Sequence, residues 1–189
     1  MKGKRRILWL AAAVALLQSG VLFAMVEQRA SALRGATNIT LLTHPVDPRD
    51  LLRGEYVALG YDISAIPTSS IEGTAPKNGP ADVFVTLRPD ASGKWAFARA
   101  SWQRPSGSRD GEITLRGRIG ALRDLTMFTT VPVTYGIERY YVAEGQGRVL
   151  EDLQRKQQIE AVVAVSPDGE AQVRALKDGD KVLDEQPSY

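Results

Sequence analysis

Two short polar clusters contain the residues that could carry out chemistry or bind a ligand. The first runs from Pro45 to Tyr61 and the second from Tyr135 to Gly145. Together they supply these candidate binding residues: Arg53, Glu55, Tyr56, Tyr61, Tyr135, Glu138, Arg139, Tyr140 and Glu144. A guanidinium and a carboxylate form planar, charge-assisted hydrogen bonds, and tyrosine offers a rigid ring with a polar end. These residue types indicate either ion pairing within the fold or recognition of a ligand or partner.

Alternation along residues 55–63 predicts which side chains of the first cluster face the core. One face of this extended strand carries the set Val57, Leu59, Tyr61 and Ile63. Glu55 falls at the end of the same face, and Tyr56 points the opposite way. In the second cluster the same parity places Ile137, Arg139 and Tyr141 on one face. Glu138 and Tyr140 then share the other face.

Charge pairing between the two clusters is expected if their strands lie near each other. Glu55 and Arg139 could then pair from the same layer. Arg53 could form a second pair with either Glu138 or Glu144.

Three uses of these residues remain open from the sequence. The first is a structural network of salt bridges, with tyrosines capping the core. The second is a surface that binds a glycan, a peptide or a protein, since tyrosine and arginine are frequent anchors in such surfaces. The third is an envelope hydrolase in which Glu138 and Glu144 act as a carboxylate pair on glycan or peptide, which requires a cleft and one raised pKa.

The string Gly54-Glu55-Tyr56, followed by Leu59 and Tyr61, resembles the motif for which the GDYXXLXY family of uncharacterised bacterial membrane-anchored proteins is named. The segment from Pro45 to Arg53 and the run from Tyr135 to Gly145 are similar to other recurrent segments of that family. Glu55 stands where the family name has Asp, so the charge is kept and the reach of the carboxylate is longer. The resemblance implies an inner-membrane anchor with an external domain, often encoded beside multi-spanning membrane proteins. It implies no reaction, cofactor or catalytic residue.

Composition excludes several kinds of site. The chain of 189 residues has no cysteine and a single histidine, so thiolate nucleophiles, disulfides, iron–sulfur clusters and multi-histidine metal centres are ruled out. We expect neither a metal nor a cofactor. Four of the 24 Lys and Arg lie within the first six residues, and the rest of the chain is close to neutral. Nucleic acid is therefore not an expected partner.

The single histidine, His44, is a weak candidate for catalysis. It precedes a proline at the end of a predicted strand, and the chain contains no Gly-x-Ser-x-Gly nucleophile elbow. We therefore expect an interaction module rather than an enzyme.

Residues 7–26 form twenty positions without a charge, which predicts a transmembrane anchor. A helix of this length spans roughly 30 Å at about 1.5 Å per residue, the thickness of a bilayer's hydrocarbon core. The alternative is a cleaved signal peptide, because Ala30-Ser31-Ala32 has the form of a cleavage site; the apolar run is longer than a signal peptide requires. The basic residues in segment 1–6 keep that end in the cytoplasm and place the remainder on the periplasmic or outer face.

Small residues recur every four positions on the predicted anchor, at Ala11, Ala15 and Ser19, with Gln18 beside them. Such a stripe lets a second transmembrane helix approach closely, although alanine is also common in anchors. The predicted partners are thus the membrane and an integral membrane protein.

The remainder of the chain is expected to be a stalk, residues 27–38, followed by a mainly β domain, residues 39–189. Period-two alternation with regular turn signals predicts an antiparallel small sandwich or open barrel. Seven or eight strands are expected, at 38–43, 55–63, 82–88, 94–102, 113–119, 131–137, 159–165 and 170–176, with another turn at 178–179 before residues 181–183. Residues 66–81 are expected to be a long loop and 103–110 an exposed one. One short amphipathic helix is expected after Gly147, where Val149, Leu150 and Leu153 share a face.

Overall fold

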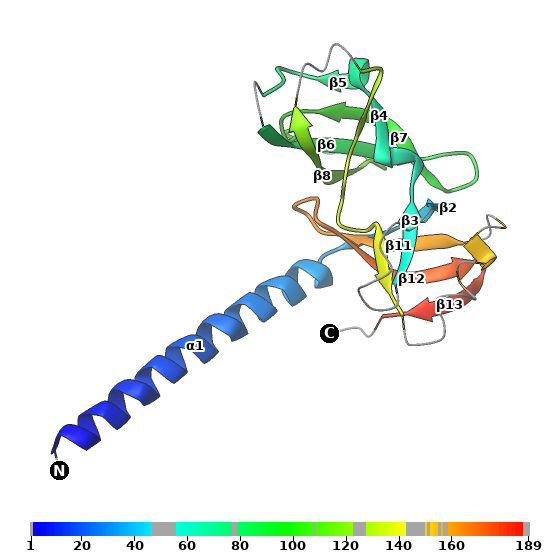
Figure 1. Ribbon diagram of the computed structural model, residues 1–189. Helices are drawn as coiled ribbons and strands as arrows, with labels where there is room; N and C mark the ends of the chain where they lie inside the picture. The colour runs from blue at the N-terminus through cyan, green and yellow to red at the C-terminus, as the bar shows by residue number, and fades with distance from the viewer. Residues whose placement is uncertain are drawn as a thin grey trace. The chain divides into compact units, whose positions relative to one another are not determined.

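The computed structural model describes residues 2–46, 56–76, 79–107, 109–122, 128–142, 150, 152–154, 156 and 159–186. The chain divides into two compact units between Ala36 and Thr37. The first unit is a single helix, α1 (Lys2–Arg34), which covers the predicted anchor and continues through most of the predicted stalk (Figure 1). Proline is absent from this stretch, and alanine and leucine, which dominate it, are strong helix formers. Among the described residues, no helix combines the length and apolar character needed to cross a membrane.

The second unit consists mostly of strands, several of them labelled in Figure 1. In chain order, its elements are β1 (Thr37–Leu42), β2 (His44–Pro45), β3 (Tyr56–Gly60), the 3₁₀ turn η1 (Asp62–Ser64), β4 (Ala65–Pro67), the 3₁₀ turn η2 (Thr68–Ser70), β5 (Ile71–Glu72), β6 (Gly79–Pro89), β7 (Trp95–Ser101), β8 (Ile113–Leu122), β9 (Thr130–Pro132), β10 (Arg139–Tyr141), β11 (Glu160–Val165), β12 (Ala171–Asp178) and β13 (Lys181–Glu185). Leu150 and residues 152–154 are helical, in the region where a short helix is predicted.

The strands pair in four sheets, with the orders β1-β11-β12-β13, β10-β3-β2, β4-β9 and β5-β7-β6-β8. Every pairing among them is antiparallel except that of β5 with β7. The prediction of a mainly β, antiparallel domain is confirmed. Its core forms one cluster, and Val83, Val85 and Leu87 are fully buried in it, as the alternation of β6 predicts.

Two predictions about individual segments are wrong. Residues 66–81 are not a plain loop, because they contain β5, most of β4 and the start of β6. Strands of two or three residues are too short to show alternation, so the sequence does not reveal them. The strand expected at 131–137 ends at Pro132, and a turn with Gly136 at φ +82° separates β9 from β10. The alternation predicts one continuous strand because alternate residues are buried both before and after the turn. These residues are Val131, Val133, Tyr135 and Ile137.

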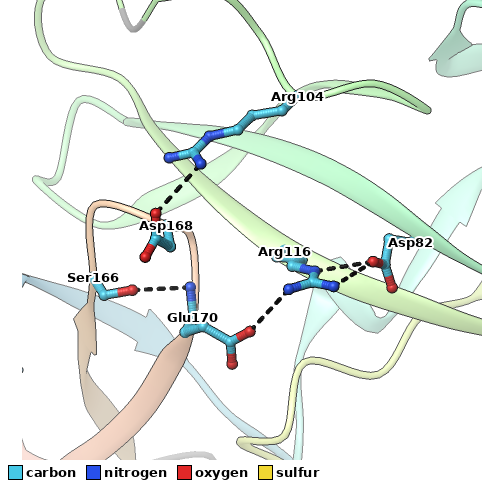
Figure 2. A network of polar contacts seen from close by, with 6 residues as sticks. All are labelled: Asp82, Arg104, Arg116, Ser166, Asp168 and Glu170. Atoms are coloured by element: carbon cyan, nitrogen blue, oxygen red, sulfur yellow. Dashed lines mark hydrogen bonds and ion pairs between the residues drawn. The ribbon is translucent and has the colours of Figure 1, made fainter. Parts of the chain in front are cut away.

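Polar contacts join the turn between β11 and β12 to the sheet that contains β6 and β8 (Figure 2). Arg116 of β8 donates to the carboxylates of Asp82 (Nε–Oδ2, 3.0 Å) and Glu170 (Nη1–Oε1, 3.3 Å), and its backbone N–H donates to the carbonyl of Gly169 (2.8 Å). Asp82 raises the pKa of Arg116. Arg104 donates to Asp168 at 3.3 Å. These side chains are largely exposed, so each ion pair contributes little free energy and the network mainly sets geometry.

Gly117 allows the segment after β9 to pack against β8. A Cβ atom at Gly117 would lie 2.9 Å from Cε1 of Tyr135 and still closer to Cγ1 of Val133. Because both neighbours are buried, we expect Gly117→Ala to lower the free energy of unfolding by about 1–3 kcal/mol through overpacking. Chemical denaturation measures the loss. Gly120→Ala on the same strand is the matched control, since its Cβ would meet nothing within 4 Å; equal losses in both variants would contradict the packing role.

Candidate binding surface on the two motif strands

The first motif enters the fold as β3, the central strand of the sheet β10-β3-β2. Val57, Leu59 and Tyr61 are buried, whereas Tyr56 is half-buried on the other face, as alternation predicts. The buried amide of Gln154 donates to the carbonyls of His44 (3.1 Å) and Ala58 (2.9 Å). This amide holds β2 and β3 to the helical segment that follows the second motif.

Two of the candidate tyrosines link the motifs to each other inside the core. The hydroxyl of Tyr61 donates to the carbonyl of Ile137 at 2.9 Å, and the hydroxyl of Tyr135 donates to the carbonyl of Ile63 at 2.7 Å. Burial, followed by the nearby charge of Glu138, raises the pKa of both hydroxyls. Tyr61 and Tyr135 are therefore structural residues, fixed by reciprocal hydrogen bonds between the two clusters.

Glu138 holds the turn that precedes β10. Its carboxylate accepts hydrogen bonds from the backbone N–H groups of Tyr135 (2.5 Å) and Gly136 (2.9 Å), and its own carbonyl accepts from the N–H of Leu59 at 2.9 Å. Gly136 has the positive φ that this turn requires and that glycine adopts without a steric penalty. The side chain predicted to pair with Arg53 is thus occupied by backbone donors.

We expect Glu138→Ala to lower the free energy of unfolding by about 1–3 kcal/mol, because two backbone N–H groups lose their acceptor. Glu138→Gln keeps one side-chain oxygen as an acceptor and is expected to lose less. Thermal unfolding of both variants measures the difference. Glu170→Ala removes only an exposed ion pair with Arg116 and serves as the control; a loss in Glu138→Ala no larger than in this control would contradict the turn-holding role.

The outer face of β3 and β10 carries three side chains that we call the tyrosine–arginine strip: Tyr56, Arg139 and Tyr141. Tyr56 pairs with Tyr141 across the two strands, and their ring centroids lie 6.0 Å apart at an interplanar angle of 56°. Cζ of Arg139 lies 5.4 Å from the centroid of the Tyr56 ring, within the range of a cation–π interaction. Tyr141 is 58% exposed, and Arg139 is exposed as well.

Tyr140 lies between the two outer residues of β10 and points into the core, opposite Val57. Its hydroxyl is buried and makes no hydrogen bond of acceptable geometry with any other described residue. Burial, and then the carboxylate of Asp184 on β13, raises the pKa of this hydroxyl. Tyr140 therefore belongs to the core and not to the strip.

The prediction that Arg139 shares a face with Ile137 is wrong, and the pairing of Glu55 with Arg139 stays a prediction. Ile137 is buried but Arg139 is exposed, because the bend at Glu138 interrupts the alternation before β10 begins. The guanidinium contacts the Tyr56 ring. Arg53, Glu55 and Glu144 lie outside the described residues.

A scan against models of known protein families matches residues 18–176 to the family described as GDYXXLXY protein. The chain belongs to the GDYXXLXY family. No curated protein and no solved structure matches it.

The named string of this GDYXXLXY protein divides into two physical roles. Leu59 and its final tyrosine, Tyr61, face the core, whereas its first tyrosine, Tyr56, lies in the exposed strip. Sequence reasoning left Tyr141 and Gln154 out of the candidate residues. Gln154 stands four positions after Leu150 on the predicted apolar helix face, and that spacing was the available signal. Tyr141 gave no such signal, because its exposure depends on the bend at Glu138.

The described residues do not show a catalytic carboxylate pair of Glu138 and Glu144. Both oxygens of Glu138 are bound by backbone donors, and Glu144 lies outside the described residues. The cavities beside Trp95 and Trp102 are lined by other residues.

Proposed function

We propose that this protein is a membrane-anchored, extracytoplasmic accessory module that binds an integral membrane partner through the tyrosine–arginine strip. Residues 7–26 serve as the anchor, the amino terminus is cytoplasmic, and the β unit lies on the periplasmic or outer face. The observation that carries the proposal is the position of Arg139 above Tyr56, with Tyr141 exposed beside them.

The strip has the chemistry of a protein-binding surface. Tyrosine rings offer a large contact area at a low cost in conformational entropy, and an arginine held against a ring is already oriented for a carboxylate. Among the described residues, no carboxylate pairs with Arg139. A partner surface with an acidic side chain among apolar groups would complement this strip.

The anchor is supported by the uncharged run of residues 7–26 and by the exposure of its large side chains. Trp9, Leu16 and Phe23 are 76%, 74% and 72% exposed on α1. Such apolar exposure is costly in water and is accommodated by lipid. The stripe of Ala11, Ala15 and Ser19 offers a second contact with a transmembrane helix of the same partner.

A photoreactive amino acid at position 141 tests the strip in native membranes. We expect one dominant crosslinked membrane protein, and we expect Arg139→Glu to reduce this product strongly, because a carboxylate there would repel the acidic partner group. The probe at position 182, where Val182 is 47% exposed on β13, serves as the control. The proposal fails if position 141 yields no specific product, or if positions 141 and 182 yield the same products in equal amounts.

Membrane topology is tested by fractionation and protease accessibility. We expect the full chain to resist extraction from membranes by alkaline carbonate. A carboxyl-terminal tag should be digested in spheroplasts and protected in intact cells. Release of the chain by carbonate, or digestion only after the inner membrane is lysed, would contradict the anchor and its orientation.

A further inference from the structure

An open cavity of about 540 Å³ lies beside β5, away from the residues of the tyrosine–arginine strip. Its walls come from η2, from β5 and the residues after it, from the residue after β7 and from the two residues before β9. The described lining residues are Thr68, Ser69, Ile71, Gly73, Ala75, Trp102, Phe128 and Thr129. The volume falls within the range of about 300–1,000 Å³ that is typical of ligand sites.

Hydrogen bonds between its walls hold this cavity open. The N–H of Thr68 donates to the carbonyl of Thr129 at 3.0 Å, and the hydroxyl of Thr68 donates to the carbonyl of Phe128 at 2.7 Å. On the other side, the N–H of Trp102 donates to the carbonyl of Glu72 at 3.0 Å. The walls are therefore joined by contacts that need no ligand, which favours a preformed site.

The lining combines aromatic rings with hydroxyl groups and has no ionisable side chain among its described residues. Trp102 is 9% exposed and belongs to the core, whereas Phe128 is 56% exposed at the rim. The hydroxyls of Ser69 and Thr129 can donate or accept hydrogen bonds. The Thr68 hydroxyl, which already donates to Phe128, can still accept one.

We propose that this cavity binds a neutral sugar unit. A sugar ring has an apolar C–H face that suits the negatively polarised face of an aromatic ring, and hydroxyls at its edge that suit the threonine and serine oxygens. A charged ligand would find no counter-charge among the described lining residues. A purely apolar chain would bury the lining hydroxyls without partners, at a cost in free energy. A proline-rich peptide needs an aromatic-lined groove, whereas only one aromatic ring among the described lining residues is well exposed.

Binding is measured by tryptophan fluorescence of the full chain in lipid nanodiscs, which avoids sugar-based detergents. The neutral probes are cellotetraose, maltotetraose and chitotetraose, and trigalacturonate is the charged probe. We expect saturable binding of at least one neutral probe and none of trigalacturonate. Glucose and N-acetylglucosamine in parallel titrations distinguish a free sugar from a unit of a glycan chain.

Two exposed positions test whether binding occurs in this cavity. We expect Phe128→Ala to weaken binding about tenfold, by removing the rim ring, and Ser69→Arg to abolish it by filling the cavity with a charged side chain. Val182→Ala is the matched control, because Val182 is 47% exposed on β13 and is not among the described lining residues. The proposal is overturned if no neutral probe binds, if Phe128→Ala and Ser69→Arg bind as well as the wild type, or if decaproline binds where the sugars do not. Crosslinking at position 141 measures partner binding by the tyrosine–arginine strip and not sugar binding by the cavity. Either proposal can therefore fail without the other.

Discussion

Raising the pH from about 9 to about 11 is expected to lower the free energy of unfolding of the β unit by about 4 kcal/mol, because three buried tyrosines stay neutral while it is folded. The pKa values of Tyr61, Tyr135 and Tyr140 are all raised, with burial as the largest cause. A phenol whose folded pKa lies above its unfolded value of about 10 contributes its full stability below that pH. Above it, the unfolded chain releases protons that the folded chain keeps, so the stability falls by about 1.4 kcal/mol per pH unit for each tyrosine and about 4 kcal/mol for the three.

Urea unfolding at several alkaline pH values, with tyrosinate absorbance recorded in parallel, measures this slope. Tyr140→Phe is the most informative variant, because the Tyr140 hydroxyl makes no well-formed hydrogen bond with a described residue. It should leave the stability near neutral pH unchanged or raised and should reduce the alkaline slope by about a third. Ionisation of all the tyrosines while the chain is still folded would contradict the burial of these three.

Tyr61→Ala is expected to lower the free energy of unfolding by about 3–5 kcal/mol, the cost of removing a large buried aromatic side chain. The variant loses the packing of a 2% exposed side chain and the hydrogen bond to the carbonyl of Ile137. Tyr61→Phe separates the two contributions, because it removes the hydroxyl alone and should cost about 1–2 kcal/mol.

The matched comparison is Tyr56→Ala, in the same motif but on the outer face. We expect it to change the free energy of unfolding by no more than about 1 kcal/mol and to weaken crosslinking of the partner at position 141. Denaturation with urea and crosslinking therefore assign the two tyrosines to different roles. Equal losses of stability in Tyr56→Ala and Tyr61→Ala would mean that the motif acts as one structural unit.

Local patterns predict the parts of this fold in which the chain stays regular over several residues. The buried face of β3 and the hairpin of β6 with β7 follow from alternation, because side chains in an extended strand point to opposite faces in turn. Alternation fails where the backbone bends, as it does at Gly136 and Glu138, and the residues of β10 then change faces. Alternation therefore predicts Arg139 on the same face as Ile137, whereas Ile137 is buried and Arg139 lies on the surface.

The amino-acid sequence by itself determined the membership in the GDYXXLXY family, the mainly β class and the candidate motifs, because these depend on short-range order along the chain. The tertiary structure decided which acceptor each polar group reaches. Glu138 accepts hydrogen bonds from two backbone N–H groups, and Tyr61 and Tyr135 donate to carbonyls more than seventy positions away in the chain. Such choices depend on the burial of groups that are distant in sequence, since a polar group removed from water takes the nearest partner that the packed chain provides.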